Sequence, residues 1–281
     1  MPKVVTIQDL SCFGKCSLTV ALPLLSAMGA ETAVLPTAIL STHTLFPGAH
    51  CMRLDAALPK ISEHWSSLGL RFDVIYSGYL ASESQVRFAI DFFRCFSDNT
   101  PLRFVDPAMA DNGRLYSGFS PSFPAVMAQL CAAADIIAPN LTEAALLSGI
   151  AYRESYDEDY LRDVLEALIP LGTRQAIVLT GVSAEAGRTG VYGLDLRSHE
   201  FFSYSHEKCG AGYHGTGDIF SSVTVGALAK GLPLRQSLSL AADFTVSCIK
   251  ASQSQGRDSR CGVCFEPEIP MLLAKLSAAG V

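Results

Sequence analysis

The chain has 281 residues, 49% of them hydrophobic, and a formal net charge of −6 at pH 7. This length and composition supply a large core, and α/β folds of this size often form one unit, so we expect a single domain over residues 1–281. The acidic balance, which no basic block offsets, argues against nucleic acid as a partner.

The start of the chain reads as a strand rather than as an export signal. Residues 3–7 are strand-like and lack the charged region, apolar run and cleavage site of a signal peptide. The uncharged stretch 16–30 is shorter than the ~20 residues that span a bilayer, and Pro23 and Gly29 interrupt it. We therefore expect a cytoplasmic protein that does not contact a membrane.

Short β-rich runs then alternate with amphipathic segments to the end of the chain. The runs 82–96 and 158–169 each carry a broad apolar stripe, and both predict helices. Two closely spaced runs, 191–196 and 201–204, predict an antiparallel pair near a sheet edge. The other strand candidates are residues 4–7, 32–35, 73–76, 103–105, 135–137 and 176–179.

This alternation predicts βαβ units. Strands that alternate with helices form a mostly parallel sheet with helices on both faces, so we expect an α/β fold, a three-layer α/β/α sandwich. A small flap is expected around residues 35–52. Near the C-terminus, Gly231 can end one helix while Pro233 opens the next.

The run Gly215-Thr216-Gly217-Asp218 stands directly before a helical segment at 219–230. Two glycines let the backbone turn tightly and expose N–H groups, and the positive end of the helix adds to a field that suits phosphate oxygens. Asp218 at the edge of such a pocket could take a proton from an attacking hydroxyl. This combination indicates phosphoryl transfer from a nucleotide to an alcohol. The alternative is a plain turn capped by Asp218.

Polar residues follow the expected strands at their carboxyl ends, where ligands bind in open parallel sheets. Together they supply carboxylates for Mg²⁺ or its waters, donors for phosphates and a base, which phosphoryl transfer needs. Structural explanations stay open: an Asp-Pro turn for Asp106, and a helix start capped by Asn140 for Glu143. The groups are Gln8-Asp9, Ser77-Gly78-Tyr79, Asp106-Pro107, Pro139-Asn140-Leu141-Thr142-Glu143 and Thr180-Gly181.

The nine cysteines cannot all pair within the chain, and a reducing compartment favours buried or inert thiols. Cys261 and Cys264 have the spacing of a metal or redox pair. They lack a second pair and a nearby His cluster, which favours a loop with incidental cysteines. No G-x-G-x-x-G follows the first strand, which argues against a dinucleotide-dependent oxidoreductase.

Several groups of residues occur in the same order as in one kinase family. They are Ile7-Gln8-Asp9, Thr37, Ser41-Thr42-His43-Thr44, Ser77-Gly78-Tyr79-Leu80, Asp106-Pro107-Ala108-Met109, residues 134–143, Leu179-Thr180-Gly181 and Gly215-Thr216-Gly217-Asp218. With them the chain resembles the pyridoxal/pyridoxamine (vitamin B6) kinases of the ribokinase-like superfamily, nearly from end to end. The His43-Thr44 and Ser77-Gly78-Tyr79-Leu80 groups look specific to vitamin B6 kinases.

The resemblance implies a ribokinase-like fold and an ATP-dependent transfer to the 5′-hydroxyl of a B6 vitamer, in pyridoxal 5′-phosphate salvage. It implies Mg²⁺ as a cofactor, permits a monovalent cation, and implies a homodimer. The implied residues are Asp218 as base; Gly215, Thr216, Gly217, Thr180 and Gly181 around the ATP phosphates; Asp106, Glu143 and Asn140 for the metal or its waters; and Asp9, His43, Thr44 and Tyr79 for the vitamer.

The chain departs from the family pattern at two places. Members of the family carry a serine where Asp9 stands, and a carboxylate there favours a cationic group such as the aminomethyl of pyridoxamine. The loop of Asp106 reads Asp-Pro-Ala-Met-Ala-Asp-Asn-Gly, without the usual Val at the third place and Gly directly after Met. We expect the carboxylate of Asp106 to keep its role.

Two alternative functions remain open. Hydroxymethylpyrimidine kinases of thiamine biosynthesis share the fold, the aspartate base and the anion hole, and their substrate is also a flat ring with a hydroxymethyl group. A non-catalytic protein that binds a B6 vitamer is the other alternative. Such a binder would not need Asp218, Asp106 and Glu143 together, so their joint presence favours an enzyme.

Overall fold

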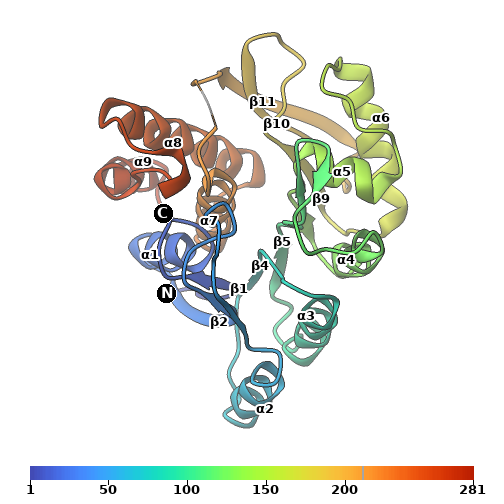
Figure 1. Ribbon diagram of the computed structural model, residues 1–281, viewed down its shortest axis with the longest axis vertical. Coiled ribbons are helices and arrows are strands. Elements are labelled where there is room, and N and C mark those ends of the chain that lie inside the picture. Colours follow the sequence, from blue (N-terminus) through green and yellow to red (C-terminus); the bar gives the residue numbers. More distant parts are fainter. Residues whose placement is uncertain (211) are drawn as a thin grey trace.

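Most of the expected strands lie in one sheet of the computed structural model, which describes residues 1–210 and 212–281 (Figure 1). Within those residues the strand order is β11-β10-β9-β8-β5-β4-β1-β2-β3, and β6 and β7 form a separate ribbon. The strands are β1 (Lys3–Ser11), β2 (Glu31–Leu40), β3 (Cys51–Arg53), β4 (Val74–Ser77), β5 (Leu102–Val105), β6 (Ala110–Asp111), β7 (Arg114–Leu115), β8 (Ile136–Ile137), β9 (Ala176–Thr180), β10 (Arg188–Asp195) and β11 (Glu200–Glu207).

The centre of the sheet is parallel and its two edges are antiparallel. Strands β2, β1, β4, β5, β8 and β9 run in one direction, each paired to the next. At one edge β10 runs antiparallel to β9 and β11 to β10, and at the other edge β3 runs antiparallel to β2. The mostly parallel sheet and the antiparallel pair near an edge are therefore confirmed.

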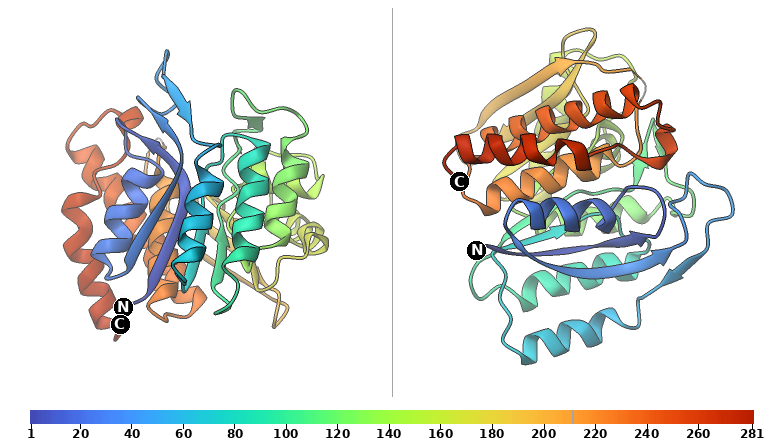
Figure 2. Two further views of the ribbon diagram at one scale, coloured as in Figure 1. Left: turned by 90° about the horizontal axis from the view of Figure 1, so that it is seen from below. Right: turned by 90° about the vertical axis from the view of Figure 1, so that its left-hand side faces the viewer.

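Helices cover both faces of the sheet, which makes three layers (Figure 2). Val4 of β1 faces one core, under α1, α7, α8 and α9, whereas its neighbour Val5 faces the other. Side chains of successive strand residues point to opposite faces, so a central strand buried on both sides is apolar throughout. The helices are α1 (Leu18–Ala27), α2 (Leu58–Ser67), α3 (Glu83–Cys95), α4 (Phe123–Ala132), α5 (Leu141–Ser148), α6 (Glu158–Leu168), α7 (Thr216–Ala229), α8 (Leu234–Ser254) and α9 (Ile269–Ala278).

Helix α1 shows that Pro23 does not interrupt its segment, contrary to expectation. The helix runs from Leu18 to Ala27 with Pro23 inside it. Pro23 is the sixth of ten residues, and its missing N–H removes one helical bond, the one to the Thr19 carbonyl. The apolar face of α1 is buried against the sheet and α7, which stabilises the helix. Among the residues that the structure describes, no helix has both the length and the apolar character that crossing a membrane requires.

Two strands extend beyond their expected ends. β1 continues past Ile7 to Ser11, and β2 continues through Pro36 to Leu40. Pro36 pairs with β1 on one side only, because β3 begins to cover β2 at Ala38, so its missing N–H breaks no bond to β3. The expected flap is thus a hairpin of residues 38–53, which projects past the sheet (Figure 2). We call it the flap hairpin.

Candidate active site

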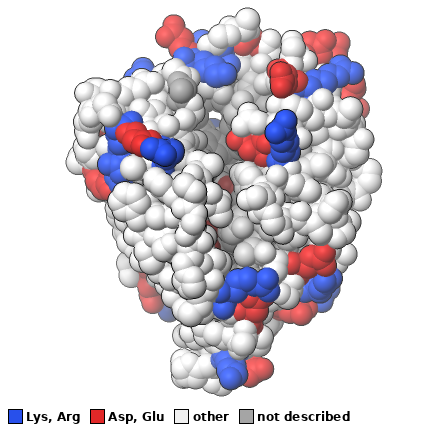
Figure 3. Space-filling view, in the orientation of Figure 1, with Lys and Arg blue, Asp and Glu red and all other residues white. Residues whose placement is uncertain are grey.

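The carboxyl ends of the parallel strands open onto a hollow in the face shown in Figure 3, with acidic side chains inside it and lysines or arginines on its rim. Asp106 follows β5, Asn140 follows β8, and Gly181 follows β9. An isolated parallel bridge joins Asn140 to Thr180, so these two predicted residues are neighbours. The polar groups expected along one rim therefore lie together.

The glycine run forms a helix N-terminus with free amides. Helix α7 begins at Thr216, three residues before the expected Ile219, so Gly217 and Asp218 lie in its first turn. The first bond of the helix runs from the Ile219 N–H to the Gly215 carbonyl, which leaves the preceding amides available to an anion. Gly215 has φ +77°, and a Cβ there would lie 2.1 Å from the Lys15 carbonyl oxygen. Only glycine fits this turn.

Asp218 and Asp106 lie close enough to affect each other's ionisation. Burial, followed by the charges of Asp106 and Asp9, raises the pKa of Asp218 to about 8, and the Ser17 backbone N–H opposes this rise. Burial raises the pKa of Asp106 to about 6, against the bond that it accepts from the Ser221 hydroxyl at 2.9 Å. A carboxyl poised near neutral pH suits a general base.

Glu143 forms the capping box of α5 and also holds the loop after Asp106. Its Oε2 accepts the Asn140 N–H at 2.9 Å, while the Asn140 side chain accepts the Glu143 N–H at 3.0 Å. Its Oε1 accepts the Met109 N–H at 3.0 Å. Burial and the charge of Asp106 raise the pKa of Glu143 well above its ordinary value. The helix-start explanation is confirmed, and the charge of Asp106 still acts on this carboxylate.

The donor set around Asp106 fits Mg²⁺ held partly through water. Within the described residues, no three His, Cys, Asp or Glu side chains are grouped closely enough to hold an ion by themselves. Mg²⁺ is usually bound by one or two carboxylates together with waters and substrate phosphates. Asp106 and Glu143 are two such carboxylates, and a cation would relieve the repulsion that raises the pKa of Glu143.

Asp9 lies inside β1 rather than after it, at a shift in register between Gln8 and Leu10. Its side chain is buried and accepts the Ser11 hydroxyl at 3.1 Å. Burial raises the pKa of Asp9, and hydrogen bonds from Ser17 and Ser11 oppose that rise. A buried acid of this kind gains from a cationic neighbour.

His43 and Tyr79 share the surroundings of Asp9. Burial is the main influence on both side chains: it lowers the pKa of His43 and raises the pKa of Tyr79 to about 12. The charge of Asp9 is a smaller influence on both, which indicates that both lie near it. The His43 Nε2 donates to the Arg260 carbonyl at 2.7 Å, and its Nδ1 accepts the Leu45 N–H at 3.4 Å, so the ring is neutral with its proton on Nε2. Thr44, by contrast, is exposed.

Two residues near the site were not predicted. Ser17 has φ +48° and ψ −129°, a strained conformation for a non-glycine residue, and it contacts both Asp9 and Asp218. His214 stacks on His43 with ring centroids 3.8 Å apart. His214 directly precedes Gly215, and this adjacency was the one signal in the sequence. Nothing in the sequence marks Ser17, because its strain arises from the fold.

The pair Cys261 and Cys264 lies apart from these carboxylates. Cys261 ends a 3₁₀ turn (Ser259–Cys261), and the buried Cys264 thiol donates to the Gln255 side chain at 3.3 Å. The segment around them is nevertheless packed on the site, because a Cβ at Gly262 would meet the Lys15 carbonyl at 2.7 Å. Lys15 therefore touches both Gly215 and Gly262.

Comparison with known proteins gives one family. Residues 54–261 match the profile of the family described as phosphomethylpyrimidine kinase. A Bacteroides thetaiotaomicron protein, provisionally named a phosphomethylpyrimidine kinase, is 36% identical with a TM-score of 0.92, covering 96% of this chain and 93% of that one. A second crystal form of that protein is described as containing pyridoxal.

Other relatives carry both kinds of kinase name. A pyridoxal kinase from Lactobacillus plantarum is 33% identical with a TM-score of 0.90, covering 99% of each chain. The probable thiamine biosynthetic bifunctional enzyme of Oryza sativa subsp. japonica is 25% identical over 260 residues, 90% of this chain, and the match covers 45% of that longer enzyme. The chain thus belongs to the ribokinase-like family of kinases that includes phosphomethylpyrimidine kinases and pyridoxal kinases.

Proposed function

We propose that this kinase transfers the γ-phosphoryl group of ATP to the 5′-hydroxyl of a vitamin B6 vitamer, in pyridoxal 5′-phosphate salvage. The observation that carries the proposal is the position of Asp218, in the first turn of α7 beside free backbone amides and Asp106. Such a turn binds an anion while its carboxylate accepts a proton. These are the two tasks of phosphoryl transfer to an alcohol.

In the proposed reaction Asp218 takes the proton of the hydroxyl as its oxygen attacks the γ-phosphorus, and ADP leaves. The ionised form of Asp218, whose pKa lies near 8 in the free protein, accepts a proton from an alcohol more readily than an ordinary carboxylate does. A cation at Asp106 would favour that ionised form, because the charge of Asp106 is one cause of the raised pKa. The amides of Gly215, Thr216 and Gly217 would stabilise the charge on the transferring group. Thr180 and Gly181, beside Asn140, would leave room for the remaining phosphates.

Asp106 would hold Mg²⁺ directly or through water, and Glu143 and Asn140 would contact its waters, because both Glu143 oxygens already accept backbone N–H groups. The ion would neutralise charge on the phosphates. When no ion is bound, the main task of Glu143 is to hold the loop that follows Asp106, by accepting the Met109 N–H. A monovalent cation is compatible with this site.

The ring of the vitamer would lie among Asp9, His43 and Tyr79, with Thr44 at the exposed side. An aromatic side chain suits a flat heterocycle, and the imidazole and carboxylate suit its polar substituents. Because Asp9 is buried and its pKa is raised, a cationic aminomethyl group would stabilise its ionised form. We therefore propose pyridoxamine as the favoured vitamer.

A second candidate is the phosphorylation of hydroxymethylpyrimidine in thiamine biosynthesis. The observation that favours it is the family profile itself, which carries the phosphomethylpyrimidine kinase name. That substrate is also an aminated ring with a hydroxymethyl group, and the same base and anion site would serve it.

Initial rates with pyridoxal, pyridoxine, pyridoxamine and hydroxymethylpyrimidine, measured side by side with ATP and Mg²⁺, test the proposal. We expect the highest kcat/KM with pyridoxamine. A highest kcat/KM with hydroxymethylpyrimidine would replace the proposed function by the second candidate, and ligand binding without ADP formation would refute both.

The family resemblance also supports three proposals about the whole molecule. We propose that the chain acts as a single kinase domain, in the cytoplasm, and as a homodimer. Sedimentation equilibrium of the purified protein tests the last of these, since a monomer at micromolar concentration would contradict it.

A further inference from the structure

The flap hairpin has little strand pairing of its own, and His43 near its tip is held by its bond to the Arg260 carbonyl and by the stack on His214. Its strand β3 pairs with only the last three residues of β2, and Cys51, Met52 and Arg53 are all exposed. A short hairpin of this kind is marginally stable by itself, so its position must depend on contacts elsewhere. The same hairpin carries His43 and Thr44, which belong to the proposed ring pocket.

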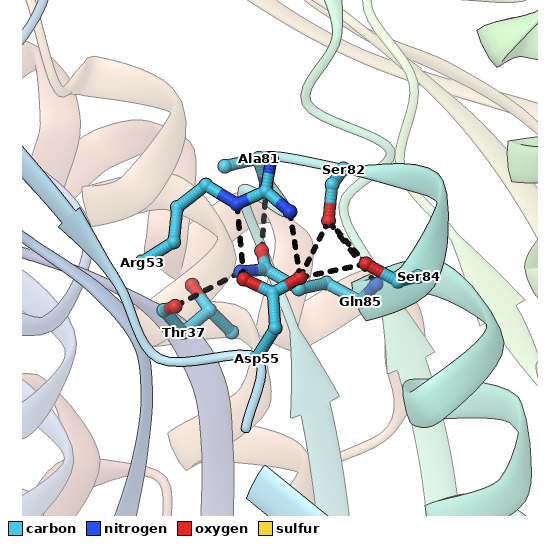
Figure 4. Close-up of polar contacts among 7 residues, drawn as sticks. All are labelled: Thr37, Arg53, Asp55, Ala81, Ser82, Ser84 and Gln85. Carbon is cyan, nitrogen blue, oxygen red and sulfur yellow. Dashed lines mark hydrogen bonds and ion pairs between the residues drawn. The ribbon is translucent and has the colours of Figure 1, made fainter. Parts of the chain in front are cut away.

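The Asp55 carboxylate, just after β3, connects the base of the flap hairpin to the start of α3 (Figure 4). On one side Arg53 binds it with two hydrogen bonds of 2.9 Å. On the other side the Ser84 hydroxyl donates to it at 2.6 Å and the Ser82 hydroxyl at 3.1 Å. A carboxylate at a helix N-terminus is further stabilised by the helix dipole.

Gln85 completes the connection from within the core. Its side chain is fully buried, and its amide nitrogen donates to Asp55 at 3.2 Å and to the Thr37 carbonyl of β2 at 2.9 Å. Its amide oxygen accepts the Ala81 N–H at 2.8 Å (Figure 4). The Gln85 amide thus contacts three partners: β2 through the Thr37 carbonyl, the Asp55 carboxylate, and the segment just before α3 through the Ala81 N–H.

Ala81 belongs to the segment 78–82 between β4 and α3, which also carries Tyr79 and which we call the Tyr79 loop. His43 and Tyr79 come from segments that meet near Asp9, and Asp55 with Gln85 joins those segments at their bases. We infer that Asp55 and Gln85 are positioning residues that fix the flap hairpin against the Tyr79 loop and so set the width of the ring pocket. The inference rests on the proposed function for the identity of the ligand and for the place of the ring pocket.

Kinetics separate this role from a general contribution to folding. Asp55→Ala should raise KM for the ring substrate at least about 10-fold, while KM for ATP changes less than about 2-fold and kcat less than about 3-fold. Asp55→Asn keeps the size and one acceptor oxygen, so its effect should be intermediate. Asp91→Ala, which removes an exposed ion pair with Arg94 on the same helix, is the matched control and should change none of these values.

Equal rises in the two KM values, or a lower Tm with both KM values unchanged, would overturn the inference. Hydrogen exchange tests it without any substrate: Asp55→Ala and Gln85→Leu should each speed exchange in both 41–53 and 78–82, and leave 216–222 unchanged. Faster exchange confined to the mutated segment would also overturn it. If the wild type phosphorylates none of the four ring compounds, the proposed function fails, and the exchange result still decides the positioning role.

Discussion

Asp218→Asn should make the free protein more stable while it abolishes most of the activity. The folded chain holds the pKa of Asp218 at about 8, against an ordinary value of 3.8, mainly because the carboxyl is buried. Above pH 3.8 the unfolded chain ionises this group while the folded chain keeps its proton, so folding stability falls as the pH rises to about 8. A neutral amide at this position does not ionise, so the variant does not lose stability in this way as the pH rises.

The size of the effect follows from the two pKa values. At about 1.4 kcal/mol per pKa unit, their separation corresponds to about 6 kcal/mol at pH 8 and above. The carboxyl is buried, but the residue as a whole is only half-buried, so nearby solvent screens its charge and we expect a gain of about 1–3 kcal/mol. For a chain of this length that gain raises Tm by about 2–5 °C. The asparagine can still accept the Ser17 N–H, so no donor is lost.

Thermal unfolding of both proteins between pH 4 and pH 9 measures this gain. The difference in Tm should be near zero at pH 4 and largest at pH 8–9. Asp163→Asn, an exposed carboxylate on α6, is the control and should change stability by less than about 0.5 kcal/mol. With the ring substrate and ATP, kcat of Asp218→Asn should fall by about 10²–10⁴, the usual span for loss of a general base.

Two results would refute the reasoning separately. A Tm difference that is negative at pH 8, or the same at every pH, would show that burial of the Asp218 charge does not destabilise the free protein. A kcat close to that of the wild type would remove Asp218 from the mechanism, whatever its effect on stability.

Three further predictions concern the residues around this base. Asp9→Ser should lower kcat/KM for pyridoxamine about 10- to 150-fold more than for pyridoxal, because a charge-assisted hydrogen bond contributes about 1.5–3 kcal/mol; equal losses would mean that Asp9 only orders its surroundings. Glu143→Gln should raise the Mg²⁺ concentration that gives half-maximal rate, and an unchanged Mg²⁺ dependence would leave Glu143 only its role in the capping box. Gly215→Ala should lower the free energy of unfolding by at least about 2 kcal/mol, since φ is +77° and the added carbon meets the Lys15 carbonyl at 2.1 Å, whereas a wild-type Tm would argue against that close approach.

The sequence predicted the layers of the fold because the spacing of apolar residues in each run distinguishes a strand from an amphipathic helix. Helices α3 and α6 begin within a residue of their expected starts, since Ser82 and Asp157 cap them through side-chain bonds that local sequence makes visible. The predicted ends of β1 and β2 were wrong, because both strands run further than expected. Asp9 and Pro36 look like strand terminators, but pairing between β1 and β2 carries both strands further.

The site was predictable where a residue acts within its own segment and not where distant segments meet. The polar groups at the strand ends could be placed, because parallel strands bring their carboxyl ends together. The bond from His43 to the Arg260 carbonyl, the stack of His214 on His43 and the strain at Ser17 each depend on contacts that local sequence does not encode. The same holds for the contact between Asp55 and Gln85.

The close approach of Lys15 to Gly215 and Gly262 has a consequence for how this chain can vary. The side chain of Lys15 reaches outward to Glu266 and over the Phe265 ring, so other residues can replace it at the cost of one partly exposed ion pair and one cation–π contact. Its backbone has no such freedom, because the carbonyl touches two glycines and the N–H donates to the Cys261 carbonyl at 3.3 Å. A single insertion or deletion in residues 12–16 would displace both distant segments, one of which begins the helix of Asp218. The length of this short loop should therefore stay constant among working variants even where its sequence drifts.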